Sequence, residues 1–93
     1  MVYAIFKANI TNPESLASYR DHAAAALTKH GGKVEQASTS PEVLDGNPDL
    51  PQMIATLSFP DADAARAWIN DPDLAPVHDL RRDAGQTEIL LLV

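Results

Sequence analysis

Apolar residues recur along this chain with two periods, and segments of strand period alternate with segments of helix period. We predict strands over residues 2–9, 33–38, 52–59 and 86–93, where residues that favour extended backbone are concentrated. The first and the last of these segments are apolar at both odd and even positions, so both are expected to be covered on two faces. Residues 39–51, rich in proline and acidic residues, are predicted to form the longest loop.

Between the strands, apolar side chains recur every three or four residues, which predicts helices packed on one face of a sheet. The first helix is expected to be capped by Asn12, which precedes a proline and an acid, and to end at His30 before a glycine pair. The second begins after the capping residue Asp61 and stops before residue 72. In residues 72–83, Pro76 should limit the helix to a turn and a short helical segment. The inward stripes are expected to be Leu16, Tyr19, Ala23, Ala26 and Leu27, then Ala64, Ala65, Trp68 and Ile69, then Leu74, Val77 and Leu80.

The order of these elements, β-α-β-β-α-β, is that of the ferredoxin-like α+β folds. One domain over residues 1–93 is expected, with a four-stranded antiparallel sheet and the helices on one face. The other face would then expose the remaining apolar positions of the first and last strands. We expect a homodimer that buries this sheet face, and sedimentation as a 10.0 kDa monomer would argue against it.

Charge and composition exclude several kinds of partner. Thirteen acidic and seven basic residues give a formal net charge of −6, which repels nucleic acid and anionic lipid surfaces. The chain has no cysteine, which excludes disulfides and thiolate metal sites and fits a reducing cytoplasm. Its first residues lack the basic head and apolar run of a secretory signal, and the apolar run at 89–93 is far shorter than the roughly 20 residues of a membrane helix. We therefore expect a cytoplasmic protein with no nucleic-acid or membrane partner.

Two polar residues of the last helical segment are candidate catalytic residues. Arg81 offers a planar fork of N–H donors to a carboxylate, phenolate or enolate oxygen if it points into a cleft between helices and sheet. His78 lies three positions earlier, hence on the same helical face, and histidine titrates near neutral pH. Together they would bind an anion and move a proton. The alternatives are an ion pair between Arg81 and an acid, or two solvated surface residues.

Three aromatic residues are candidates for binding a substrate. Trp68, the only tryptophan, offers a flat wall for an aromatic or polyketide-like ligand. Tyr3 and Tyr19 can pack their rings in the core and still present an O–H group to a cavity. For each of the three, the alternative is an ordinary core position.

His30 is a third catalytic candidate, beside the glycine pair Gly31-Gly32. A phosphate-binding loop needs glycines that lead into a helix, whereas this pair follows a helix end and is expected to be a helix cap. A charged His30 would also favour the negative end of the helix dipole, which explains its position without catalysis. No histidine pair at i, i+4 spacing and no spaced set of histidine and acids indicates a metal, so no metal or organic cofactor is expected.

Several short motifs occur together in one order. They are Tyr3, Tyr19, His30-Gly31-Gly32-Lys33, Leu44-Asp45-Gly46, Phe59-Pro60-Asp61, Ala64-Ala65, Ala67-Trp68, Asp71-Pro72 and Leu80-Arg81. In spacing and order they resemble the family called domain of unknown function 1330 (DUF1330), of the dimeric α+β barrel superfamily, and the resemblance covers nearly the whole chain. It implies a ferredoxin-like fold and a homodimer. Cofactor-free monooxygenases, muconolactone isomerase-like enzymes and chlorite dismutase-like haem proteins share this superfamily, so the fold does not select an activity.

Two hypotheses of function follow. The first is a small homodimeric enzyme without an organic cofactor, which acts on a hydrophobic or aromatic oxygenated metabolite in a cleft of each protomer. In it the arginine stabilises oxyanion charge, a histidine moves a proton, and the aromatic residues line the cleft. The second is a non-catalytic binding or accessory dimer that uses the same cleft.

Overall fold

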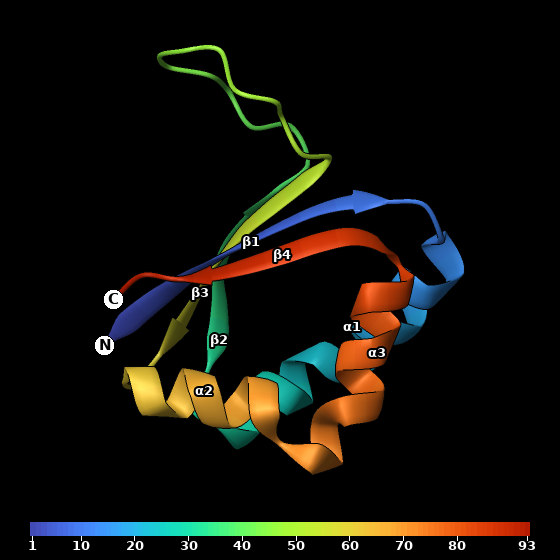
Figure 1. Cartoon of the computed structure of the whole chain (residues 1–93), viewed down its shortest axis with the longest axis vertical. Helices are drawn as coiled ribbons and strands as arrows, with labels where there is room; N and C mark the ends of the chain where they lie inside the picture. Colours follow the sequence, from blue (N-terminus) through green and yellow to red (C-terminus); the bar gives the residue numbers. More distant parts are fainter.

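In the computed structural model, which describes all 93 residues, the chain forms a four-stranded antiparallel sheet with helices on one face (Figure 1). The elements are β1 (Val2–Ile10), α1 (Pro13–Lys29), β2 (Lys33–Ser38), β3 (Met53–Phe59), α2 (Ala62–Asn70), the 3₁₀ turn η1 (Pro72–Leu74), α3 (Ala75–Asp83) and β4 (Gly85–Leu91). The strand order is β2-β3-β1-β4. The predicted α+β fold and order of elements are confirmed, and so is the turn followed by a short helix.

Polar caps and glycines set the helix ends where the sequence predicted them. Asn12 and Asp61 each accept, through a side-chain oxygen, a hydrogen bond from the backbone N–H three residues later, at 3.3 and 2.7 Å. After α1, Gly31 takes a left-handed φ of +73°, and Gly32 N donates to Leu27 O at 2.8 Å. The glycine pair is therefore a helix cap that turns the chain into β2.

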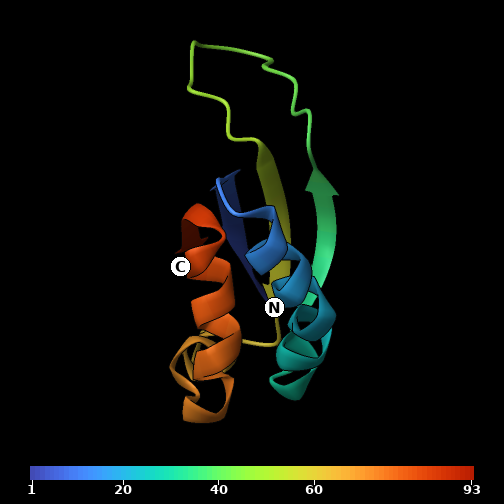
Figure 2. The same ribbon diagram turned by 90° about the vertical axis from the view of Figure 1, so that its right-hand side faces the viewer.

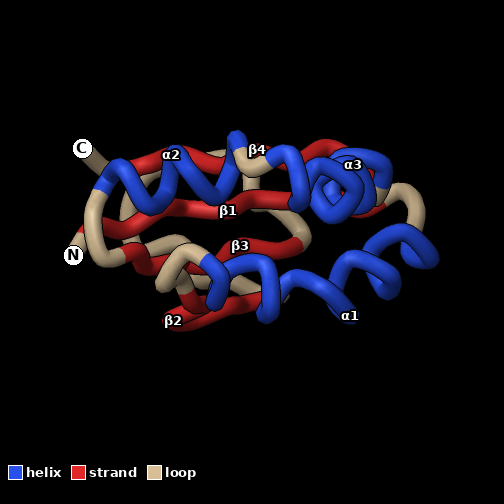
Figure 3. Tube along the Cα trace, turned by 90° about the horizontal axis from the view of Figure 1, so that it is seen from below, coloured by secondary structure: helices blue, strands red, loops and turns tan.

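The molecule has two layers, with the helices over one face of the sheet (Figures 2 and 3), and it measures 38 × 32 × 16 Å along its principal axes. Helix α1 packs against α3, and α2 packs on β3 and on both of the other helices. None of the helices combines the length and the apolar character that a membrane span requires. The main core lies between the two layers and consists of Ala4, Ala26, Leu27, Leu57, Phe59, Ala65, Trp68 and Leu74.

Residues 39–52 form a long loop that projects beyond the sheet and the helices (Figures 1 and 2). Its base is fixed to β1, because Gln52 N donates to Asn9 Oδ1 at 3.0 Å and Ile10 N donates to Gln52 Oε1 at 2.8 Å. Farther out the loop is solvent-exposed, and Leu44 is 91% exposed. The side chain of Gln52 thus belongs to the loop base, which is why β3 starts one residue later than predicted.

The face of the sheet that no helix covers has an apolar half and a polar half. The register pairs Ile5 with Leu90 in the apolar half and Lys7 with Glu88 in the polar half. Tyr3 extends the apolar half and is 42% exposed, while Leu90 is 53% exposed. Within one chain, therefore, β1 and β4 are not covered on both faces, and the homodimer that would cover them stays a prediction.

Candidate ligand-binding site

The inner face of α3 is polar, although the sequence predicted an apolar stripe there. His78 and Arg81 are only 1% and 3% exposed, whereas Val77 and Leu80 are partly buried. A strict threefold spacing drifts around a helix of 3.6 residues per turn, but spacing by four and then three stays on one face. Leu74, His78 and Arg81 follow that second spacing. The interpretation of this pair as solvated surface residues was therefore wrong.

Both ring nitrogens of His78 are engaged in hydrogen bonds. Nε2 lies 2.9 Å from the carbonyl oxygen of Trp68, which only accepts, so Nε2 carries the proton and donates it. Nδ1 lies 2.7 Å from Arg81 Nη1, which only donates, so Nδ1 is the acceptor. His78 is thus a neutral imidazole of defined tautomer. Burial lowers its pKa, and the charges of Arg81 and Arg82 act in the same direction.

Arg81 is a buried cation without an anionic partner. Its bond to His78 is the only hydrogen bond of its guanidinium within the chain, and it forms no ion pair. The guanidinium carbon lies 5.5 Å from the ring centre of Trp68 and 5.8 Å from that of Tyr19. These aromatic faces hold a cation in place without neutralising it. The ion-pair alternative was therefore wrong for Arg81, whereas its exposed neighbour Arg82 does pair with Asp79, at 3.5 Å.

Arg81 lies in a groove between the helices and β4 that has an apolar end and a charged end. An apolar pocket of about 170 Å³ and a polar pocket of about 230 Å³ share Ile69 and Ile89 in their walls, so the two adjoin. We call them together the β4 groove. Its walls are Ala4, Phe59, Ala65, Arg66, Trp68, Ile69, Ile89 and Leu91 at the apolar end, and Ile69, Arg81, Arg82, Thr87, Glu88 and Ile89 at the charged end.

Trp68 belongs to the core and to the groove at once. It is 2% exposed, and its ring packs on Phe59, with ring centres 5.5 Å apart, and edge-on against His78 at 4.8 Å. Its indole Nε1 is buried and has no hydrogen-bond partner, which is rare for a buried donor. Tyr19 lines a separate apolar pocket of about 160 Å³ between α1 and the sheet, which also borders Ile89. The structure thus brings four of the predicted residues together: Trp68, Tyr19, His78 and Arg81.

The other two predicted residues lie elsewhere. Tyr3 is on the uncovered face of the sheet, opposite to the helices. His30 ends α1, and its Nε2 lies 2.8 Å from Asp71 Oδ2, an oxygen that also binds Lys29 Nζ at 2.7 Å. The bonds from Lys29, His30 and the backbone N–H of Asp73 lower the pKa of the Asp71 carboxyl. His30 therefore joins the end of α1 to the α2–α3 junction and forms no hydrogen bond with the groove residues Arg81 and His78.

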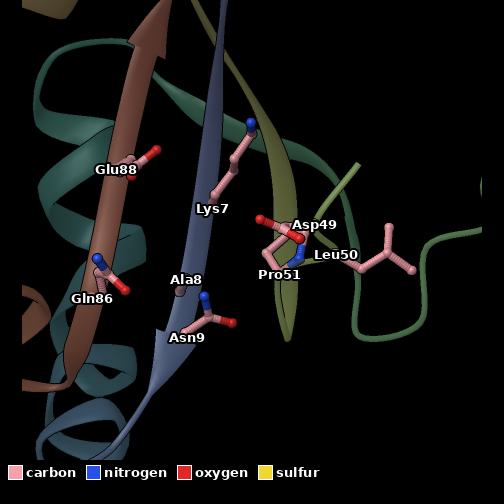
Figure 4. A pocket seen from close by; sticks show the side chains of 8 residues that line it. All are labelled: Lys7, Ala8, Asn9, Asp49, Leu50, Pro51, Gln86 and Glu88. Atoms are coloured by element: carbon pink, nitrogen blue, oxygen red, sulfur yellow. The ribbon is translucent and has the colours of Figure 1, made fainter. Parts of the chain in front are cut away.

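Another polar pocket, of about 230 Å³, lies where the projecting loop meets the uncovered face of the sheet (Figure 4). Lys7 and Asn9 from β1, Gln86 and Glu88 from β4, and Asp49 from the loop line it. Lys7 and Glu88 are register partners but form no ion pair. No group of three or more histidine, aspartate or glutamate side chains in the chain is placed to hold a metal ion. Sequence reasoning did not indicate this pocket, because its two walls come from segments far apart in the chain.

Three solved structures are similar to this fold, and two of them come from proteins described as uncharacterised or of unknown function. RPA0582 of Rhodopseudomonas palustris, titled a protein of unknown function, has a TM-score of 0.76 at 17% identity, over 98% of this chain and 79% of that one. An uncharacterised NIPSNAP domain protein of Burkholderia xenovorans has a TM-score of 0.61 at 18% identity, over 100% and 93%. Protein Atu4242 of Agrobacterium tumefaciens has a TM-score of 0.65 at 17% identity, over 100% and 92%. At this identity the likeness establishes the fold alone.

Sequence comparison identifies the family. Among curated proteins there is no significant match. The profile described as domain of unknown function (DUF1330) matches residues 1–93, the whole chain, in agreement with the resemblance carried by the motifs from Tyr3 to Leu80-Arg81. This chain belongs to the DUF1330 family.

Proposed function

We propose that this protein binds a hydrophobic or aromatic oxygenated metabolite in the β4 groove. One observation carries the proposal: an apolar pocket adjoins a buried arginine that has no anionic partner. Ligand sites in proteins are largely apolar and contain a few polar groups that fix the orientation of the ligand. The β4 groove has this composition, since Ile69 from α2 and Ile89 from β4 border both its apolar end and its charged end.

The apolar end has the size of an aromatic ring. Its volume is about 170 Å³, close to the roughly 150 Å³ of an engineered apolar cavity that binds benzene. Ala65, Trp68 and Leu91 contribute to a wall that offers a ring dispersion contacts and almost no hydrogen bonds. We therefore expect the apolar part of the ligand to be a ring or a short branched chain, and its oxygen to face Arg81.

The proposed binding unit is a homodimer formed through the uncovered sheet face. Exposed apolar side chains gather on that face and on the adjacent ends of the chain, where Tyr3, Leu90 and Leu92 are all more than 40% exposed. No helix covers this face, so these side chains are exposed to solvent in a monomer. Association of two such faces removes this apolar area from water, and a two-fold axis lets one patch serve as its own partner.

Turnover is the second candidate, and one observation favours it. A guanidinium stabilises the oxyanion of an enolate or phenolate as well as a carboxylate, so Arg81 suits the cofactor-independent chemistry predicted from the sequence. Proton transfer by His78 is disfavoured, because both of its ring nitrogens already form hydrogen bonds within the protein. Binding without turnover therefore remains our first conclusion. Recovery of a converted compound after incubation with stoichiometric protein would favour the enzyme instead.

A neutral aromatic probe tests the groove itself. Trp68 is the only tryptophan and lines the apolar end, so its fluorescence reports on a ligand there. Titration with 3-phenylpropanamide is expected to change this fluorescence in a saturable way. Ala65→Leu should fill the apolar end and abolish the response, whereas Ala67→Leu, on the exposed side of α2, should leave it intact. An equal response in both variants would refute the groove as the binding site.

A further inference from the structure

We infer that the group recognised in the β4 groove is an anionic oxygen, in the simplest case a carboxylate, and that His78 positions Arg81 to bind it. The inference rests on the proposed function and specifies its ligand class. Arg81 is 97% buried in terms of its accessible surface, since only 3% remains exposed, yet it faces a pocket of about 230 Å³. The buried guanidinium of Arg81 thus already lines this cavity when no ligand is bound.

The buried charge of Arg81 lacks a compensating charge in the protein. Proteins almost always pair a buried charge, because removal from water is costly unless an opposite charge compensates. The cation–π contacts with Trp68 and Tyr19 compensate only in part. Four of the five guanidinium N–H donors have no acceptor in the protein. A carboxylate is the group that matches both the charge and the planar fork of these donors.

His78 fixes the direction of this fork. Its Nδ1 accepts from Arg81 Nη1 at 2.7 Å, and its Nε2–H is anchored on the carbonyl oxygen of Trp68 at 2.9 Å. The chain of bonds therefore runs from the end of α2 through the imidazole to the guanidinium. Because one side of the guanidinium is held, its remaining donors are preorganised for a ligand. In this role His78 is a positioning residue, and it acts on the ligand through Arg81.

The other charges around the groove sharpen the choice of class. Arg82 lines the charged end and Arg66 the apolar end, but both are exposed and pair with acids on their own helices, Asp79 and Asp63. Glu88 also borders the charged end and disfavours ligands with several negative charges. The groove thus fits one negative charge on an apolar body, in contrast to a phosphate ester or a dicarboxylate.

A pair of probes that differ only in charge tests the inference on the unmodified protein. The probes are 3-phenylpropanoate and its neutral amide, titrated against Trp68 fluorescence at constant ionic strength in a buffer without carboxylate or phosphate. A charge-assisted bond to a buried arginine predicts that the carboxylate binds about 10- to 100-fold more tightly. Equal affinity for the two probes overturns the inference and leaves the proposed function standing. Failure of both probes to bind overturns the proposed function, and the inference with it.

Substitutions of Arg81 and His78 test whether these residues cause the preference for the carboxylate probe. Arg81→Met should reduce the ratio of carboxylate to amide affinity to about one, and Arg81→Lys, which keeps the charge without the fork, should keep part of it. His78→Phe keeps the aromatic packing on Trp68 and should reduce the ratio while amide affinity stays unchanged, an effect that lost stability alone does not produce. Arg82→Met tests the exposed arginine of the charged end, and Arg20→Met, at an exposed arginine outside the β4 groove, is the matched control that should retain the full ratio.

The results with these variants distinguish a wrong location of the anion from a wrong role of His78. Loss of the preference in Arg82→Met but not in Arg81→Met would place the anion at the exposed arginine and overturn the inference. A wild-type ratio in His78→Phe would overturn the positioning role of His78. If Arg81→Met does not fold, as judged by circular dichroism, Arg81→Lys and the comparison of the two probes on the unmodified protein decide the question.

Discussion

Replacement of Gly85 by alanine is expected to disrupt the contact between β4 and the end of β1. Gly85 has a φ of +156°, and an added Cβ would lie 2.1 Å from Asn9 O, 2.9 Å from Thr11 N and 3.0 Å from Ile10 Cα. All three are backbone atoms, so no side-chain rotation relieves the overlap. Two further backbone bonds meet beside this point, because Thr11 N and Asn12 N both donate to Ala84 O at 2.9 Å.

The expected loss of stability is the sum of backbone strain at residue 85 and weakened hydrogen bonds to Ala84. Backbone strain of a non-glycine residue in such a conformation costs about 1–3 kcal/mol, and loss or stretching of two hydrogen bonds costs about 1–3 kcal/mol more. Gly85→Ala is therefore expected to lower the free energy of unfolding by about 2–6 kcal/mol. For a domain of this size each kcal/mol lowers Tm by about 4–8 °C, so a fall of at least about 8 °C is expected in thermal denaturation.

Gly46→Ala is the matched control for this prediction. Gly46 also has a left-handed φ, +85°, but an added Cβ would meet no atom within 4 Å. Its replacement therefore measures the conformational cost without the overlap, about 1–2 kcal/mol. Equal losses in the two variants would show that the β1–β4 junction yields to a Cβ and would refute the rigid close approach that we infer there.

Three further predictions concern assembly and pH. Leu90→Glu on the uncovered sheet face should convert a species of twice the 10.0 kDa chain mass into a monomer in sedimentation, and Ala67→Glu on the exposed side of α2 should not; a wild-type monomer would contradict the dimer. Burial lowers the pKa of His78 below 6.5, so below that pH the unfolded chain binds a proton at this residue more readily than the folded chain does. As the pH is lowered, the free energy of unfolding should therefore decrease less steeply in His78→Gln than in the wild type. The Asp71 carboxyl has a lowered pKa because it accepts bonds from Lys29 and His30, so its stabilising effect is present above its ordinary pKa of 3.8 and is lost as pH falls below it. Asp71→Asn should therefore lower Tm at pH 7, and the difference in Tm between this variant and the wild type should become smaller below pH 4. An unchanged Tm at pH 7 would contradict a stabilising role of the cluster formed by Asp71, Lys29 and His30.

Local chemistry made the fold predictable from the sequence. Caps and glycines act on their immediate neighbours, so Asn12, Asp61 and the glycine pair marked helix ends that the structure confirms. The same-face placement of His78 and Arg81 is equally local, and their hydrogen bond follows from a three-residue spacing on one helix. These features depend on few residues and on backbone geometry alone.

The burial of the arginine–histidine pair depends on the whole fold and was not predictable. An apolar pattern favours Val77 and Leu80 as the inward residues of α3, but the direction in which a short helix turns is set by the elements that hold its ends. Here the backbone bonds from Thr11 and Asn12 to Ala84 fix the C-terminal end of α3. The same limit applies to the β4 groove, because its walls come from strands and helices that only the tertiary structure brings together.

The position of Arg81 and His78 indicates that stability alone did not decide their identity. A domain this small buries about 60% of the surface of its unfolded chain, so its stability depends strongly on its 16 buried residues. Two of these positions hold a cation and an imidazole, where apolar residues of similar volume would often be as stable or more so. Departures from apolar packing of this kind are expected at functional sites. The thin core therefore supports our proposal that the β4 groove binds a ligand, and we propose an anion as the group that compensates the charge of Arg81.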